Sequence, residues 1–319
     1  MKILILAFLV LQGGCASLLK TVGSDYHQGR SISILTVNLF NQRLMAEGAD
    51  NNWKGDWLFR RERLEIVDLS IMSMRPDLIL FQELLGRRGS PSESDRSILS
   101  YGSLDGYQWG LSRTDFFEDT QEEEYLGLAI GSPLSLDEEV DSYWGKLGSD
   151  GRYSLRGILI EGQPFWVVNV SMPSNSEETN KAYEVLRKNI LELQGKLSFC
   201  NERLIVAGYL PSDVTLPNYQ KLLETFQLKD TSLGFCEIYS QCYTATTENE
   251  VFRNTSQGKS EAQVDRILAH NETIVYAGKI ALDDEKASTE RARFYGLSNH
   301  WPTRRYGWST ILRLTQCRK

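Results

Sequence analysis

The sequence lacks several features that would define a class of protein. Its longest apolar run, Ile3–Leu11, has nine residues and is too short to cross a bilayer as a helix. Basic residues do not exceed acidic ones, because 35 Lys and Arg stand against 42 Asp and Glu and the net charge is −7. A global field of this sign does not favour non-specific binding to nucleic acid, although a local basic groove is compatible with it. No shift in composition marks a second domain within the 319 residues.

The N-terminus has the pattern of an export signal over residues 1–15. Lys2 supplies a positive end, the apolar run forms the core, and Gly13-Gly14-Cys15 follows it. The arrangement resembles a bacterial lipoprotein signal, in which the cysteine becomes the lipidated first residue. Gln12 departs from the aliphatic residue usual in that signal, so simple secretion, to the periplasm or beyond, or an uncleaved anchor is the alternative. Ala16 as the second mature residue favours the outer membrane of a bacterial cell envelope over the inner one.

Cysteine is scarce, and an even number remains once Cys15 is set aside. An oxidising compartment could pair the four others, in any of three connectivities, or they could be unrelated buried thiols. A disulfide between Cys236 and Cys242 is favoured, because a separation of six residues within one loop makes closure easy. The other two cysteines are Cys200 and Cys317.

Residues 16–30 are polar and patternless and are predicted to be a tether, whereas residues 31–315 are predicted to form one domain. The predicted strands are Ser31–Phe40, Leu78–Phe81, Tyr107–Thr114, Tyr125–Ile130, Tyr153–Ile160, Phe165–Val170, Arg203–Ala207, Gln263–Ala269 and Trp308–Leu314. The predicted helices are Asp56–Met74, Glu177–Leu197 and Pro217–Phe226. A strand, helix, strand succession occurs twice, which favours two sheets packed face to face with helices outside.

One stretch combines a buried strand with a carboxylate. Pro76 and Asp77 end the first helix, Leu78–Phe81 is a continuous apolar run, and the run stops at Gln82-Glu83. A strand end is where α/β folds place their chemistry, and a carboxylate oxygen there could hold a hard cation such as Mg²⁺. Taken alone, Glu83 is better explained as the first solvated residue after a buried strand. Other blocks of the chain change this interpretation.

Seven short blocks of the sequence resemble motifs of the endonuclease/exonuclease/phosphatase superfamily, which is also called the DNase I-like family. They stand in the same order as in that family and cover residues 31–314. The blocks are Thr36–Asn38, Pro76–Glu83, Gly127–Ile130, Val167–Asn169, Leu204–Gly208, Val264–Ile267 and Ser298–Pro302. None is specific alone, but seven in order are hard to produce by chance. The resemblance implies a four-layered α/β sandwich, with two packed mixed sheets flanked by helices, and metal-assisted attack of water on a phosphate ester.

The resemblance also implies roles for four residues. Asn38 matches an asparagine that orders the metal site, and Glu83 matches the carboxylate that binds Mg²⁺, for which Mn²⁺ could substitute. Asp265 matches the acid that orients a histidine, and His300 matches that histidine, which stabilises the charge developing on the phosphate. A hard cation and an imidazolium are wanted there because both neutralise a phosphoryl transition state.

Other family positions are not matched. After Gly208 the family continues with an aspartate that orients the attacking water and an asparagine that contacts phosphate, but here the residues are Tyr209 and Pro211. Tyrosine is neutral at pH 7, and proline has no donor. Ser171 stands where the family has a histidine or tyrosine, and Asn299 replaces a metal-contacting aspartate.

Three residues could replace the missing groups, and none is well placed. Asp213 would have to fold back into the site, His27 lies in the tether, and His270 projects from the strand face opposite to that of Asp265. The sequence therefore favours a phosphoester-binding family member with an impaired or abolished hydrolytic centre, joined to a membrane by its lipid. The alternatives are an active Mg²⁺-dependent phosphodiesterase with a rebuilt site and a sandwich with an unrelated binding function.

Overall fold

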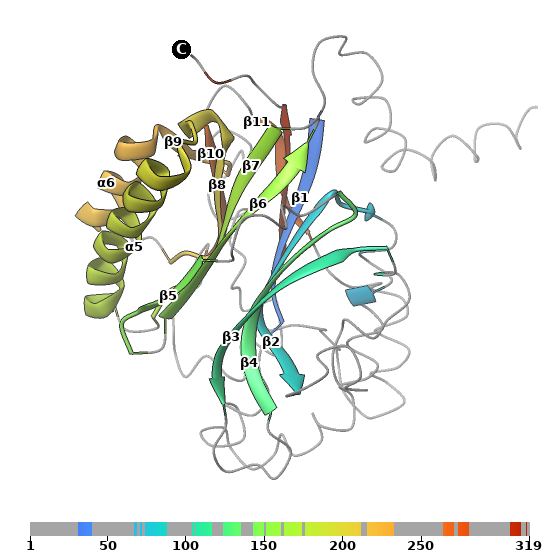
Figure 1. Cartoon of the computed structure of the whole chain (residues 1–319), viewed down its shortest axis with the longest axis horizontal. Coiled ribbons are helices and arrows are strands. Elements are labelled where there is room, and N and C mark those ends of the chain that lie inside the picture. Colours follow the sequence, from blue (N-terminus) through green and yellow to red (C-terminus); the bar gives the residue numbers. More distant parts are fainter. Residues whose placement is uncertain are drawn as a thin grey trace, which may run out of the picture.

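A computed structural model describes most of the predicted domain. The structure describes residues 31–39, 67–68, 71, 74–87, 104, 106–116, 124–134, 143–149, 151–160, 163–173, 176–211, 216–232, 264–270, 274–280, 307–313 and 317. Within these ranges the chain forms two six-stranded sheets, with helices on the outer side of the second sheet (Figure 1).

The first sheet contains both ends of the domain. Its strands follow the order β11 (Ile274–Ile280), β12 (Gly307–Arg313), β1 (Ser31–Asn38), β2 (Leu78–Arg87), β4 (Glu124–Ser132) and β3 (Gln108–Phe116). β1 and β2 are parallel, and every other neighbouring pair is antiparallel. The sheet is therefore mixed, as the two predicted strand, helix, strand units require.

The second sheet repeats this plan. Its order is β5 (Tyr143–Leu147), β6 (Gly151–Ile160), β7 (Gln163–Ser171), β8 (Leu204–Tyr209), β10 (Asp265–His270) and β9 (Leu228–Asp230). β7 and β8 are its parallel pair, and α5 (Ser176–Leu197) connects them. α6 (Pro217–Phe226) follows β8 and packs against α5 (Figure 1).

Three apolar clusters show how the layers are stacked. The cluster between the sheets includes Ile34, Leu80, Val167, Ala207 and Ile267. A second cluster joins the outer face of the second sheet to α5 and α6, and includes Val168, Tyr183, Leu186, Val206 and Leu222. The third covers the outer face of the first sheet, where the helical residues Val67 and Ile71 meet Leu35, Val37 and Phe81. Helix, sheet, sheet and helix form four layers, so the predicted four-layered α/β sandwich is confirmed.

Three short strands were not predicted. β5 lies within a segment interpreted as a loop, and β9 and β11 carried no strand prediction. Each lies at the edge of its sheet, where half of the backbone groups have no neighbouring strand and the residue pattern is correspondingly weak. The predicted end of the central strand at Gln82-Glu83 is also wrong, because β2 runs through these residues to Arg87.

A disulfide joins the C-terminal end of the described chain to the second sheet. Cys200, just before β8, is bonded to Cys317, with 5.7 Å between the two Cα atoms. Of the three possible connectivities, this pair is the one that leaves Cys236 and Cys242 to each other. Those two residues lie outside the described ranges, so their predicted bond stays a prediction.

The predicted export signal and tether, residues 1–30, also lie outside the described residues. Within the described part of the chain, no helix combines the length and apolarity needed to cross a membrane.

Candidate functional site

Asn38 and Glu83 lie together at the end of the parallel pair of the first sheet. The Nδ2 of Asn38 donates a hydrogen bond of 2.8 Å to Oε1 of Glu83. Asn38 is buried and Glu83 is partly buried. The amide therefore fixes one carboxylate oxygen, and this is how an asparagine can order a metal-binding carboxylate. The sequence predicted that these residues act together; their metal-binding role stays a prediction.

A β-bulge brings the two side chains together. Phe81 faces Ala129 across the sheet and Leu84 faces Gly127, so two residues of β2 oppose one residue of β4. Glu83 has a φ of 55°, a left-handed conformation that costs a non-glycine residue about 1–2 kcal/mol. In a regular strand Glu83 would face the outer helical layer. The bulge turns it to the inter-sheet side, on which Asn38 lies, and Leu84 takes its place in the outer core.

Buried amides connect this edge to the second sheet. Gln82 donates from Nε2 to Oδ1 of Asn169 on β7 at 2.8 Å and to Oγ1 of Thr36 at 3.0 Å. Asn169 in turn donates from Nδ2 to the carbonyl oxygens of Phe81 and Ala129, both at 2.9 Å. The strand ends of the two sheets therefore share one polar junction.

On the second sheet, three candidate positions lie side by side. Ser171 is the register partner of Tyr209 on the parallel pair β7–β8, and Tyr209 is the register partner of Asp265 on β10. Asp265 is fully buried. Gly208 precedes Tyr209 with a φ of 130°, and a Cβ there would lie 2.1 Å from the carbonyl oxygen of Val170. Only glycine allows β7 and β8 to approach this closely.

The Tyr209 ring and the backbone of Pro211 contact the helical layer. Tyr209 packs against the apolar cluster beneath α5 and α6. The carbonyl oxygen of Pro211 accepts a hydrogen bond of 3.1 Å from the hydroxyl of Tyr183 on α5. Burial raises the pKa of that hydroxyl above its ordinary value, so it stays a proton donor. At these two positions the observed contacts hold the helical layer to the end of β8.

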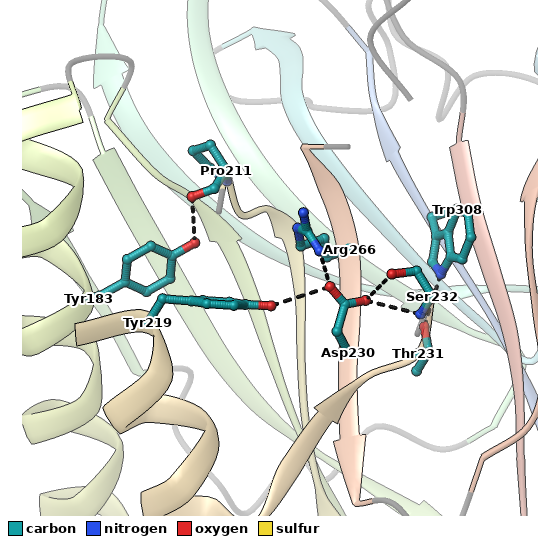
Figure 2. Close-up of polar contacts among 8 residues, drawn as sticks. All are labelled: Tyr183, Pro211, Tyr219, Asp230, Thr231, Ser232, Arg266 and Trp308. Carbon is teal, nitrogen blue, oxygen red and sulfur yellow. Dashed lines mark hydrogen bonds and ion pairs between the residues drawn. The ribbon is translucent and has the colours of Figure 1, made fainter. Parts of the chain in front are cut away.

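The residue after Asp265 belongs to a buried ion pair, which the sequence analysis did not predict. Arg266, the next residue along β10, forms an ion pair with Asp230 at the end of β9, and both side chains are 2% exposed (Figure 2). Asp230 also accepts hydrogen bonds from the Tyr219 hydroxyl at 3.3 Å and from the backbone nitrogen and hydroxyl of Ser232 at 3.0 and 2.7 Å. These four residues, Tyr219, Asp230, Ser232 and Arg266, form the Asp230 cluster. The arginine after the motif aspartate was the available signal.

Thr231, which follows Asp230 in the chain, joins the Asp230 cluster to the first sheet. Trp308 of β12 donates from Nε1 to the hydroxyl of Thr231 at 2.9 Å (Figure 2). Trp308 is fully buried and is the register partner of Thr36. The start of β10, which carries Asp265, is therefore fixed to α6, β9 and β12 together.

Several predicted site residues lie outside the described residues: His300, Asn299, Asp213 and Cys15. His300 and Asp265 are therefore not placed relative to each other, and their pairing stays a prediction. His270 is described, and its Nε2 lies 3.5 Å from Oε1 of Gln227, which follows α6.

The described donors do not fit a tightly held Mg²⁺ ion. In the described ranges, no three Asp, Glu, His or Cys side chains gather closely enough to hold a metal. Asn38 and Glu83 together offer one negative charge. A hard divalent cation keeps its water shell unless several charged oxygens replace it. Tyr209, where the resemblance expects a carboxylate, adds no such charge.

Solved structures with this fold cover most of the chain. The human Nocturnin catalytic domain with a bound sulfate anion is 16% identical, with 89% of this chain and 94% of that one covered and a TM-score of 0.60. A humanized D. rerio TDP2 is 13% identical, with 89% and 99% covered and a TM-score of 0.55. An endonuclease/exonuclease/phosphatase family protein from Leptotrichia buccalis C-1013-b is 15% identical, with 89% and 100% covered and a TM-score of 0.54. No protein-family model and no curated protein matches the sequence.

Identities of 13 to 16% establish the fold and leave the chemistry open. At that level the comparisons confirm the predicted DNase I-like fold, which this chain shares with these solved structures.

Proposed function

We propose that this chain is an exported lipoprotein whose phosphoesterase-like domain binds a phosphoester ligand and hydrolyses it poorly or not at all. The observation that carries this proposal is which residues stand at the end of β8 and what they contact. The Tyr209 ring packs against the helical layer, and the backbone carbonyl oxygen of Pro211 accepts a hydrogen bond from Tyr183. The Tyr209 ring therefore supports the fold where the family has the aspartate that orients water, and Pro211 has no side-chain donor where the family has the asparagine that contacts phosphate.

The expected loss of rate follows from the groups replaced. A general base is worth about 10²- to 10⁴-fold in rate, and a transition-state donor about 10²- to 10³-fold. Losses within one constellation do not multiply freely, but removal of several members leaves little catalysis. Ligand binding needs fewer groups. The sulfate held by the human Nocturnin domain is an oxyanion of the kind a phosphoester presents.

A second candidate is an active Mg²⁺-dependent phosphodiesterase with a rebuilt site. The hydrogen bond between Asn38 and Glu83 favours it, because the bulge that positions Glu83 costs energy and a carboxylate with no ligand would not need it. On this reading the missing groups come from residues outside the family pattern.

An activity screen of the full chain separates the two candidates. We expect no turnover of plasmid DNA, a generic aryl phosphodiester or sphingomyelin with Mg²⁺ or Mn²⁺ beyond that of the Glu83→Ala variant. Metal-dependent turnover of any of the three that disappears in Glu83→Ala would establish the second candidate instead.

The lipid anchor gives a separate prediction. Cys15→Ser removes the proposed acceptor thiol, so the protein should leave the membrane fraction or fail to mature. Fractionation of cells and mass spectrometry of the N-terminus measure this. Cys236→Ser is the matched control and should stay membrane-bound. Unlipidated wild-type protein in the soluble periplasm would contradict the anchor and leave the fold of the domain unaffected.

A further inference from the structure

β6 presents a row of polar side chains to the space between the sheets. Arg152, Ser154 and Arg156 alternate along the strand, and Ile158, next in the same row, belongs to the inter-sheet cluster. Since alternate residues of a strand share a face, the three polar residues face the first sheet. Their β7 partners include Ser171 for Arg152 and Asn169 for Ser154. The row therefore runs beside the candidate site.

The side chain of Arg156 packs against the first sheet at Gly110. A Cβ built on Gly110 of β3 would be 2.3 Å from Cδ and from Nε of Arg156. The side chain thus lies over Gly110, where a side chain on β3 would displace it. The Nε of Arg156 is buried and has no hydrogen-bond partner among the described residues. Burial lowers the pKa of this guanidinium. No carboxylate of the described residues offsets the desolvation of this guanidinium, so a bound anion would stabilise it.

Ser154, like Arg156, has a buried polar atom without a hydrogen-bond partner among the described residues. It is 1% exposed, and its Oγ has no partner within the described part of the chain. It lies two residues from Arg156 on the same face, a separation of about 7 Å between Cα atoms in a strand. A hydroxyl can donate to an anion or accept from a water that bridges to one.

Arg152 differs from its two neighbours in the row. It donates from Nη1 to the carbonyl oxygens of Ser149 and Gly151 at 3.3 and 2.6 Å, in the turn that leads into β6. Its guanidinium is therefore committed to that turn, which leaves Arg156 and Ser154 as the groups that can receive a ligand.

We propose that Arg156 and Ser154 form an oxyanion subsite that holds the phosphate group of the ligand beside the polar junction at Asn169. This inference rests on the proposed function for its ligand class. Guanidinium binds phosphate and sulfate oxygens through two parallel hydrogen bonds, which an ammonium cannot reproduce. Because the whole chain carries a charge of −7, one local cation selects a small phosphate group over a polyanion.

Calorimetric titration of the full chain with inorganic phosphate tests the subsite. Arg156→Ala should weaken phosphate binding by at least about tenfold, and Arg156→Lys should restore only part of it. Lys146→Ala, which removes an exposed cation from the neighbouring strand β5, is the charge-matched control and should change the affinity less than about twofold. Equal phosphate affinity in Arg156→Ala and wild type, or no binding by wild type, would overturn the proposal.

Thermal unfolding separates a ligand site from a structural role. A ligand-binding arginine without a protein partner stabilises little, so Arg156→Ala should unfold at the same temperature as wild type or higher in phosphate-free buffer, whereas loss of a structural arginine would lower it. Added phosphate should then raise the wild-type midpoint but not that of the variant. A lower midpoint for Arg156→Ala without phosphate would overturn the assignment. Metal-dependent phosphodiester turnover by wild type would overturn the proposed function, not the subsite.

Discussion

Asp230→Ala should lower the free energy of unfolding by about 3–5 kcal/mol, because it removes the carboxylate that is paired with the buried guanidinium of Arg266. Arg266 and Asp230 are each 2% exposed, and burial already lowers the pKa of Arg266. The variant also removes the acceptor of Tyr219 and of both donors of Ser232 (Figure 2). Denaturant unfolding followed by circular dichroism measures the change.

Two variants control this prediction. Glu224→Ala removes an exposed carboxylate from α6 and should change stability by no more than about 0.5 kcal/mol. The double variant Asp230→Ala with Arg266→Met should lose less than Asp230→Ala alone, because the buried guanidinium is then removed together with its carboxylate. A loss below about 1 kcal/mol in Asp230→Ala would mean that the ion pair does not hold β9, β10 and α6 together.

Restoring the family residues should raise hydrolysis by about 10²-fold or more, the usual contribution of a general base. The variant combines Tyr209→Asp, Pro211→Asn and Asn299→Asp. Two added carboxylates join Glu83, so Mg²⁺ affinity should also increase by at least about tenfold. Turnover of an aryl phosphodiester in Mg²⁺ and calorimetry measure the two effects.

The matched control carries amides in place of the new carboxylates. Tyr209→Asn with Pro211→Asn, and Asn299 left unchanged, alters the same β8 positions without adding charge. It should gain neither cation affinity nor turnover. An equal gain in this control would show that the residues at the end of β8 obstruct the site by their size. No gain in the charged variant would show that these three positions do not account for the lost activity.

The central strands and long helices could be predicted from the sequence because each carries a complete local pattern. Leu204–Tyr209 is a continuous apolar run, and α5 buries a regular stripe that includes Ala182, Leu186 and Ile190. The edge strands β5, β9 and β11 were missed because pairing with a single neighbour defines them. In β5 the exposed residues Trp144 and Lys146 alternate with the partly buried Tyr143 and Gly145, and the strand is only five residues long.

The candidate site could be predicted only in part, for reasons of geometry. Asn38 could be placed at the end of its strand and Glu83 after a buried apolar run, but the bulge that turns Glu83 toward Asn38 depends on pairing between β2 and β4. The close approach of β7 and β8 at Gly208, the residue before Tyr209, likewise depends on strand pairing. Neither feature has a local sequence pattern. The sequence therefore shows that Tyr209 replaces a catalytic aspartate, but it does not show that the tyrosine ring packs into the helical layer.

Calorimetric titration of the full chain with Mg²⁺ tests the central claim most directly. The described residues place one carboxylate, that of Glu83, with Asn38 at the expected metal position. We therefore expect a dissociation constant in the millimolar range or weaker, with Glu83→Ala scarcely different from wild type. Micromolar binding of Mg²⁺ or Mn²⁺ that is lost in Glu83→Ala and accompanied by phosphodiester turnover would contradict the account, because it would mean that the hydrolytic centre is intact.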